Sequence, residues 1–323
     1  MDKDAPEPGP PQLHAEADAS RWDERIARAR ELAAEDSPAA GILTFYARLA
    51  EYQRSLGLFS SRRSAGLQTC THAGPGRTEV LRCTHTQDAP AHETGSPLTP
   101  DFVQTVDLDA ASAAVPDFLA WLHRTAPEPL ARAAAATLRP KREQWRQLMH
   151  RCLTQSDDDL AEDAMTFVME AVVQPFTEAA AIAWRADGPK SSAPGVRASI
   201  CPICSGRPVV AILREEGHGA RRTLLCALCL NEWEFPRVVC PACDEQRFDV
   251  LPVYTADVFS HVRIDACDNC KRYLKTVDLT KNGLAVPLVD DLASVALDLW
   301  AHQQGYRRLR TNLLRTAEVQ SEK

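Results

Sequence analysis

Several features are scarce in this sequence of 323 residues, and each scarcity excludes a class of protein. Glycine occurs only 14 times, which argues against a glycine-rich phosphate-binding architecture and against collagen-like repeats. Positive charge is not in excess, since 37 Lys and Arg stand against 44 Asp and Glu, so a protein that wraps nucleic acid is not expected. No apolar stretch approaches the roughly 20 residues that a membrane-spanning helix needs.

The N-terminal segment lacks the marks of an export signal. Residues 1–19 are acidic and rich in proline, with no basic start, no apolar core and no twin arginine. This composition predicts a disordered leader. Without an export signal, the protein is expected to be cytoplasmic.

Cysteine, in contrast, is concentrated in one part of the chain. There are 11 cysteines, and 8 of them lie between Cys201 and Cys270. In a reducing compartment such a group is more typical of metal binding or redox chemistry than of structural disulfides.

The part before this group is predicted to be helical. Residues 20–185 carry apolar positions at helical spacing, which indicates a domain of roughly six helices. The first helix is expected from about Arg21 to Ala34, and the second is expected to end at Gly57. Pro175 should kink or divide the last helix. A polar stretch at 60–98 interrupts the pattern and is interpreted as a loop insertion.

The remaining segments are shorter. Residues 186–199 have the composition of a linker. Residues 286–323 predict a helix and a tail, with Asp290 as the N-cap, Asp291 as a charge of the first turn and Gly305 after the last turn. The residues expected on the inward face of this helix are Leu292, Val295, Ala296, Leu299 and Trp300.

Four Cys-x-x-Cys pairs follow one another in the cysteine-rich region, with 21, 10 and 23 residues between them. A Cys-x-x-Cys turn aims two sulfurs at one point, and two such turns complete a tetrahedral four-sulfur site for zinc or iron. The pairs are Cys201 and Cys204, Cys226 and Cys229, Cys240 and Cys243, and Cys267 and Cys270.

The order knuckle, hairpin, knuckle occurs twice, which predicts two tandem rubredoxin-like ribbons over 200–236 and 237–285. The simplest assignment takes the pairs consecutively, the first two in one metal site and the last two in the other. An interleaved assignment stays open, because only 10 residues separate the middle pairs. Each ribbon is too small to fold without its ion. The spacing does not decide between iron and zinc, or between a structural and a redox role.

Other candidates have simpler interpretations. Cys70-Thr71-His72 and Cys83-Thr84-His85 repeat a Cys-x-His pattern that could bind a metal, but incidental repetition in a polar loop is favoured. Cys152 is expected to be a small buried apolar residue. His218 is interpreted as a turn residue. His261 is expected on a strand surface, with a place beside the second metal site as the alternative.

No catalytic constellation is recognisable. The sequence has no glycine-rich nucleotide motif in the right context and no supported Ser, His and Asp set. The first ribbon is locally basic, and a solvated face is the simplest interpretation of its arginines, with an acidic protein or a nucleic acid as alternative partners. These arginines are Arg207, Arg214, Arg221 and Arg222.

The C-terminal part resembles the formate dehydrogenase accessory protein FdhE family. The specific resemblance covers 199–314, and Gln174-Pro175-Phe176 is similar to an element of the long helix in that family. Besides the four cysteine pairs, it is carried by Trp233, Tyr273-Leu274-Lys275, Asp290-Asp291-Leu292-Ala293-Ser294, Leu297-Asp298, Gly305-Tyr306 and Asn312-Leu313.

The resemblance implies an α+β multidomain fold, in which an all-α N-terminal domain precedes two tandem rubredoxin-like metal-binding domains and a C-terminal helix. It further implies a cytoplasmic, non-catalytic protein for the assembly of respiratory formate dehydrogenase, which binds the catalytic subunit of that enzyme before export. The family is associated with iron at the cysteine pairs, and this raises a redox role for them.

Two other functions are kept as alternatives. One is a rubredoxin-like redox or electron-transfer protein. The other is a nucleic-acid-binding zinc-ribbon protein, which the net charge of −7 and the acidic second ribbon disfavour. The acidic residues of that ribbon are Asp244, Glu245, Asp249, Asp257, Asp265 and Asp268.

Overall fold

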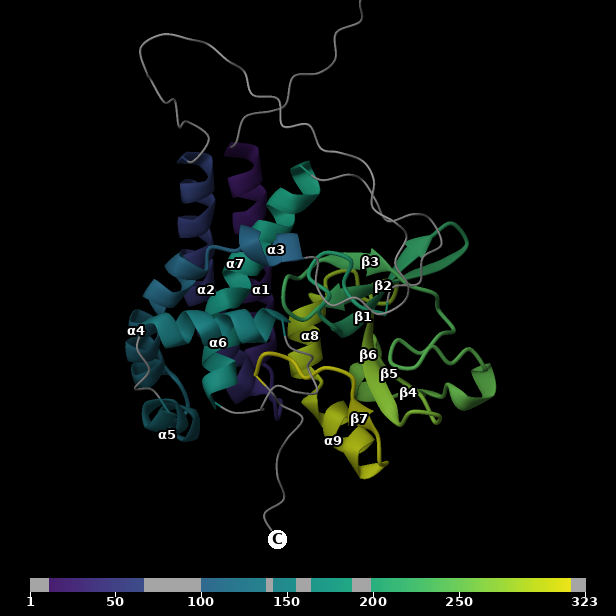
Figure 1. The fold of residues 1–323 in the computed structure, drawn as a ribbon. Coiled ribbons are helices and arrows are strands. Elements are labelled where there is room, and N and C mark those ends of the chain that lie inside the picture. The colour runs from purple at the N-terminus through teal and green to yellow at the C-terminus, as the bar shows by residue number, and fades with distance from the viewer. Residues whose placement is uncertain (1–11, 67–99, 138–141, 155–163, 188–198, 315–323) are drawn as a thin grey trace, which may run out of the picture.

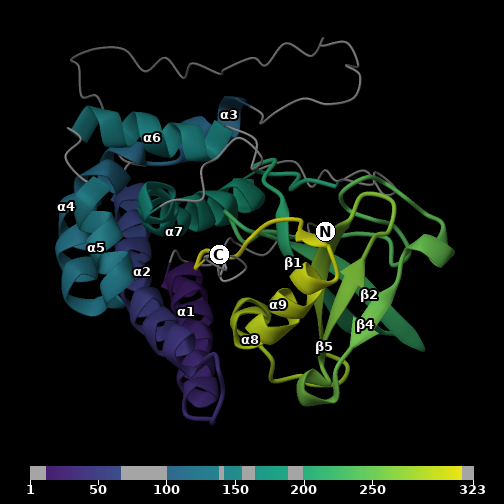
Figure 2. The ribbon, with the colours of Figure 1, turned by 90° about the horizontal axis from the view of Figure 1, so that it is seen from below.

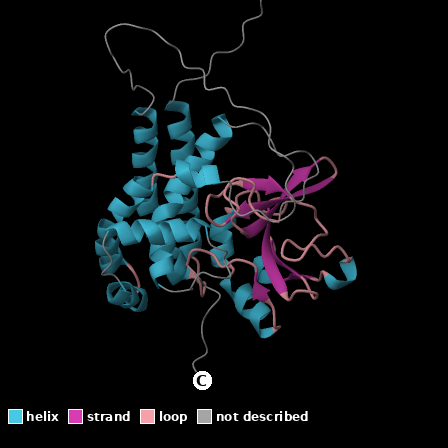
Figure 3. Ribbon diagram, viewed as in Figure 1, coloured by secondary structure: helices cyan, strands magenta, loops and turns pink. Residues whose placement is uncertain are grey.

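The helices of the N-terminal part and the strands occupy opposite sides of the molecule, with the two C-terminal helices on the side of the strands (Figure 1; Figure 3). The structure, a computed structural model, describes residues 12–66, 100–137, 142–154, 164–187 and 199–314. The helical half consists of α1 (Gln12–Ala33), α2 (Ala40–Gly66), α3 (Pro100–Thr105), α4 (Leu108–Thr125), α5 (Glu128–Thr137), α6 (Arg142–Thr154) and α7 (Ala164–Asp187). An α+β fold with a helical N-terminal part is thereby confirmed.

Helix α1 begins at Gln12, inside the stretch 1–19 for which the composition predicts a disordered leader. Helix α2 continues past Gly57 to Gly66, so that glycine does not end the helix. A Cβ at Gly57 would lie 3.7 Å from Trp22 Nε1 and 3.8 Å from Pro175 Cβ, which are ordinary van der Waals distances, so Gly57 faces α1 and α7 in the middle of the packed helices. The Cys-x-His repeat lies outside the described residues.

Helix α7 continues through Pro175, so this proline does not divide it. Its residues Phe167, Val172 and Phe176 are buried in a core that also contains Phe118 of α4. The same core continues to Leu224 in the sheet half. The helices and the first ribbon therefore share one hydrophobic core.

The strands form one sheet in the order β3-β2-β1-β6-β5-β4, with β7 paired to β6. The strands are β1 (Pro208–Glu216), β2 (Gly219–Cys226), β3 (Glu232–Glu234), β4 (Val253–Thr255), β5 (Val262–Ala266), β6 (Arg272–Asp278) and β7 (Arg307–Arg308). Strands β1 to β3 are antiparallel, as are β4 to β6, and each set forms one of the predicted ribbons. A parallel pairing of Ala211 to Leu213 with Thr276 to Asp278 joins the two ribbons edge to edge.

The predicted C-terminal helix is divided in two. Helix α8 (Pro287–Ala293) and helix α9 (Val295–Gln303) meet at Ser294, whose φ of −95° and ψ of 32° are not helical. The break changes the inward face, so that Leu297 and Ala301 are buried whereas Leu299 is 38% exposed. Gly305 has a φ of 82° and follows the C-cap Gln304, in line with its predicted place after the last turn.

The prediction of Asp290 as an N-cap is wrong. The N-cap of α8 is Val286, and Asp290 lies one turn inside the helix with a buried side chain. Asp290 Oδ2 accepts a hydrogen bond of 2.7 Å from the backbone N–H of Val286. The carboxylate also binds Arg28 Nη2 of α1 at 2.7 Å and His261 Nε2 at 2.8 Å. It therefore joins three segments that are far apart in the sequence.

This arrangement places α8 between the helical half and the sheet (Figure 2). Val289 and Leu292 of α8 pack with Trp22 and Leu43 of the first two helices. Burial alone would raise the pKa of Asp290, but hydrogen bonds from His261 and Arg28 outweigh it and lower the pKa below its ordinary value of 3.8. The carboxylate is thus held ionised at the junction.

Four charged side chains are buried together beside α8 and α9. Lys275 Nζ lies 2.6 Å from Asp298 Oδ2 and 3.0 Å from Asp291 Oδ1, and Arg308 pairs with both aspartates. Tyr273 Oη donates to Asp298 Oδ1 at 2.8 Å. Lys275, Asp291 and Asp298 have no exposed surface. Two positive and two negative charges balance, and this balance makes their burial tolerable.

Lys275→Met should lower the free energy of unfolding by about 3–5 kcal/mol, because it leaves two buried carboxylates facing a single arginine. The matched control is Arg132→Ala, whose ion pair with Glu128 is 72% and 82% exposed and should contribute no more than about 0.5 kcal/mol. Urea unfolding of the full chain measures both. A Lys275→Met protein as stable as the control would refute a structural role for the four charges.

Candidate metal centres

Each Cys-x-x-Cys pair forms the same tight turn. The backbone N–H of the first cysteine donates to a carbonyl five residues on, as in Cys201 to Gly206 at 2.8 Å and Cys240 to Glu245 at 2.9 Å. The residue after the second cysteine lies in the left-handed region, with φ between 54° and 62°. These four residues are Ser205, Leu230, Asp244 and Lys271. The left-handed conformation costs free energy for a residue with a side chain. It occurs in all four turns because the chain has to change direction directly after the second cysteine.

Backbone N–H groups point at the sulfurs of these turns. The N–H of Ile203 lies 3.5 Å from Cys201 Sγ, and the N–H of Ala242 lies 3.4 Å from Cys240 Sγ. Such donors favour the negatively charged thiolate. At Gly206 a Cβ would come within 3.1 Å of Cys226 Sγ, so the glycine makes room for the sulfur.

The structure gathers the cysteines in consecutive sets. In each set the four sulfurs all lie within 4.8 Å of one another. The first cluster is Cys201, Cys204, Cys226 and Cys229, and the second cluster is Cys240, Cys243, Cys267 and Cys270. The interleaved arrangement is not formed.

The sulfur spacing fits a tetrahedral ion. Sulfur pairs across the first cluster are 3.6 and 3.3 Å apart, and pairs across the second cluster are both 3.7 Å apart. These distances are far longer than the roughly 2.05 Å of a disulfide bond. Four sulfurs at about 2.3 Å from a central zinc would be about 3.8 Å apart, close to the observed spacing. Both clusters are therefore capable of holding a metal ion.

The two clusters differ in exposure. All four cysteines of the first cluster are buried, whereas Cys243 of the second cluster is exposed and Cys270 is half-buried. Burial raises the pKa of Cys226 and Cys229 well above the usual value, and it raises the pKa of Cys270 to about 11. Binding of a cation would therefore be coupled to release of protons from these thiols.

Helix α7 holds one turn of the first cluster in place. Gln174 Nε2 donates to the carbonyl of Ala227 at 2.9 Å, and Thr177 Oγ1 donates to the carbonyl of Leu228 at 3.0 Å. Both carbonyls belong to the turn that carries Cys226. Sequence reasoning noted Gln174 only as part of a family-like element, since nothing local indicates what its side chain contacts.

None of the remaining candidates is part of either four-cysteine cluster. His218 is in the turn between β1 and β2, and His261 pairs with Asp290. Cys152 packs against the helical core. Arg214 and Arg221 form ion pairs with Glu232 and Glu234, respectively, and Arg222 is buried. Among the helices that the structure describes, none is long and apolar enough to cross a membrane.

With zinc in both clusters, a chelator that reports released metal should remove two ions in separate phases. The ion of the second cluster should leave first, because Cys243 is exposed. The ion of the first cluster should leave at least about tenfold more slowly, the factor given by an extra local opening of about 1.4 kcal/mol. Cys243→Ser should abolish the fast phase alone, and Cys152→Ser should change neither. A single phase, or loss of the slow phase in Cys243→Ser, would contradict the assignment.

Comparisons with known proteins match this region. Residues 200–237 match the model of the FdhE central domain, and residues 238–315 match the model of the FdhE C-terminal domain. A protein named FdhE homolog from Aquifex aeolicus is 32% identical over 160 residues, which is 49% of this chain and 54% of that protein. The FdhE homolog of Pseudomonas aeruginosa strain PAO1 is 34% identical over 125 residues, which is 36% of this chain and 39% of that protein.

These alignments span about half or less of the length of the curated relatives. The crystal structure of the FdhE protein from Pseudomonas aeruginosa has a TM-score of 0.63 at 23% identity and covers 92% of this chain and 96% of that chain. It therefore shares the fold of both halves. Both four-cysteine clusters lie inside the matched domains, so residues 200–315 of this chain are similar to the central and C-terminal domains of the FdhE family.

Proposed function

We propose that this protein is an accessory factor that binds the catalytic subunit of a respiratory formate dehydrogenase in the cytoplasm and assists its assembly and maturation. The observation that carries the proposal is the match of residues 200–315 to the two FdhE domains, which contain both four-cysteine clusters. The proposed partner is the one implied by the resemblance to the FdhE family. The predicted ribbons, 200–236 and 237–285, would be the parts that present the metal-containing surface.

The eight clustered cysteines are the proposed ligands of two ions, each iron or zinc. In this proposal the first ion is structural, because α7 and the shared core enclose its cluster. When bound, the ions neutralise the thiolates and hold each ribbon folded.

Several contacts support a role without catalysis. Asp290, Asp291 and Asp298, whose carboxylates could in principle serve acid and base chemistry, are all buried in ion pairs. His261 is bound to Asp290. These side chains connect elements of the fold. This structural role is enough to explain why they are buried, and no substrate is needed to explain it.

Exposure of Cys243 favours a second candidate function, in which the second cluster holds iron that changes oxidation state. An exposed ligand gives an electron donor or acceptor a short path to the ion. Anaerobic purification followed by metal analysis and voltammetry tests this candidate. A native protein that contains zinc alone and shows no redox couple would exclude it.

The partner proposal is tested by co-purification. A tagged full chain should retain the catalytic subunit of formate dehydrogenase from cells that express both, and deletion of the chain should abolish formate dehydrogenase activity. Cys243→Ser should release the partner, because loss of the second ion unfolds the partner-binding ribbon. Cys152→Ser, which changes a cysteine outside the clusters, should retain it.

Thermal unfolding of each variant is the control for a general loss of the fold. Cys201→Ala is expected to unfold the first ribbon and is therefore less informative than Cys243→Ser. Normal formate dehydrogenase activity in the deletion strain, together with no association in cells, would refute the proposal.

A further inference from the structure

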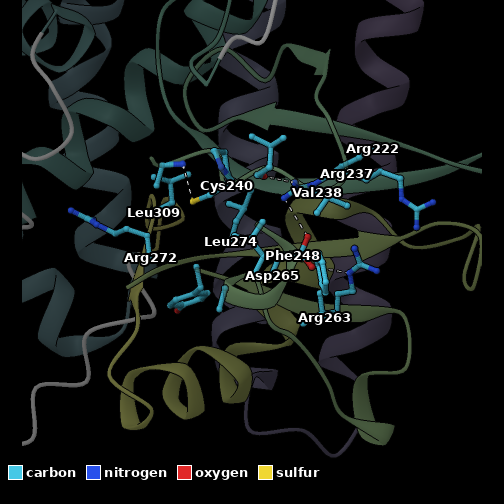
Figure 4. Close-up of a pocket in the computed structure, with 17 residues that line it drawn as sticks. Arg222, Arg237, Val238, Cys240, Phe248, Arg263, Asp265, Arg272, Leu274 and Leu309 are labelled. Atoms are coloured by element: carbon cyan, nitrogen blue, oxygen red, sulfur yellow. Dashed lines mark hydrogen bonds and ion pairs between the residues drawn. The ribbon is translucent and has the colours of Figure 1, made fainter. Parts of the chain in front are cut away.

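A cavity of about 200 Å³ lies where the two ribbons meet, beside the second cluster (Figure 4). Its walls are formed by residues 237–242, by Phe248 and Leu251, and by residues of β5 and β6. Cys240 lines it, so the cavity reaches the metal centre itself. A cavity of about 150 Å³ accommodates benzene, so this one has room for a single large apolar side chain.

Apolar side chains around the cavity are exposed to solvent. Phe248 is 81% exposed, Val238 is 52% exposed and Val253 is 51% exposed. All three line the cavity, although Val238 comes from a turn, Phe248 from a short 3-10 helix and Val253 from β4. Exposed apolar side chains that gather around a concave site are typical of a protein-binding surface.

The cavity is also positively charged. Arg222, Arg237 and Arg263 lie at one end and Arg272 at the other, whereas Asp265 is the one acidic residue in the lining (Figure 4). A metal-loaded cluster, whose four thiolates and divalent ion carry two negative charges, would offset part of this positive charge. A ligand with a carboxylate would balance it.

Arg222 supplies the second indication of an anionic ligand. The side chain is 3% exposed, and its Nη1 donates to the carbonyls of Pro236 and Val239 at 3.2 Å each. Its Nη2 lies 3.2 Å from Asp265 Oδ2, outside hydrogen-bonding alignment, and its Nε has no acceptor. Asp265 is shared with Arg263 at 2.9 Å. Its Nε–H and Nη2–H thus lack an acceptor among the described residues, and an oxyanion that reached them would supply one.

We propose that this cavity binds an extended segment of the partner protein in which one aromatic or large aliphatic side chain stands next to a carboxylate. The apolar side chain would fill the cavity against Phe248 and Val238, and the carboxylate would reach the arginines. The inference deepens the proposed function, because the segment would belong to the protein that this chain assists.

The test uses a synthetic peptide, so it does not require the partner segment to be identified. The acetylated and amidated tetrapeptide Gly-Phe-Glu-Gly is titrated into the metal-loaded full chain, and backbone and arginine Nε–H resonances are followed by NMR. Saturable shifts are expected at Arg222 Nε–H and at Val238 and Phe248. Peptides with Ala for Phe, or with Gln for Glu, should bind at least about tenfold more weakly.

Matched variants locate the binding. Arg237→Glu and Phe248→Ser change exposed residues of the lining and should each weaken binding at least about tenfold. Arg48→Glu, on the exposed face of α2, and Leu284→Ser, which removes an 82% exposed leucine, should leave it unchanged. The salt dependence of binding should be smaller in Arg237→Glu.

Three outcomes would overturn the inference. One is a tetrapeptide that produces no saturable shifts. Another is binding that survives both lining variants. The third is a free aromatic acid, such as phenylacetate, that binds while the tetrapeptide does not compete, because the cavity would then be a small-molecule site. Failure of co-purification with formate dehydrogenase leaves all three measurements interpretable, so the two proposals fail separately.

Discussion

The buried ammonium of Lys275 holds the two C-terminal helices, α8 and α9, against the sheet. Besides its two carboxylates, Nζ donates to the carbonyl of Asp291 at 2.6 Å and lies 3.2 Å from Ser294 Oγ. It therefore satisfies backbone carbonyls at the C-terminal end of α8, where a positive charge is favoured. In a continuous helix, backbone N–H groups would donate to these carbonyls. The helix can break at Ser294 because the Lys275 ammonium donates to them instead. Through Asp290, the same short helix then positions the helical half.

The helices and the metal-binding region depend on one another in both directions. Helix α7 fixes the turn around Cys226 through Gln174 and Thr177, and apolar residues of the first ribbon complete the core that α4 and α7 begin. The second ribbon reaches the helices mainly through α8, and its cluster is less enclosed. This asymmetry leaves the first cluster enclosed by the fold and the second cluster beside the cavity that is proposed to bind a partner.

The parts that the sequence predicted well have local causes. Spacing within each Cys-x-x-Cys pair is enough to bring two sulfurs together, and the alternation of pairs with strand-forming runs indicates two ribbons. The parts that it missed depend on distant contacts. Asp290 looks like an N-cap, and its real partners are Arg28 and His261. Gly57 looks like a helix end, but it lies inside α2, where it faces Trp22 and Pro175. Neither partner can be recognised from the neighbouring residues.

The parallel contact joins β1, the first strand of the first ribbon, to β6, the last strand of the second ribbon. Because the two ribbons use different edges, the contact is head-to-tail and does not form a closed pair. A third ribbon could add to either outer edge in the same manner, and so could a second molecule. The outer strands β3 and β4 are only three residues long, which leaves few backbone groups for such an addition. Because both outer strands are short, neither edge of the sheet offers a long row of backbone groups to which a further strand could pair.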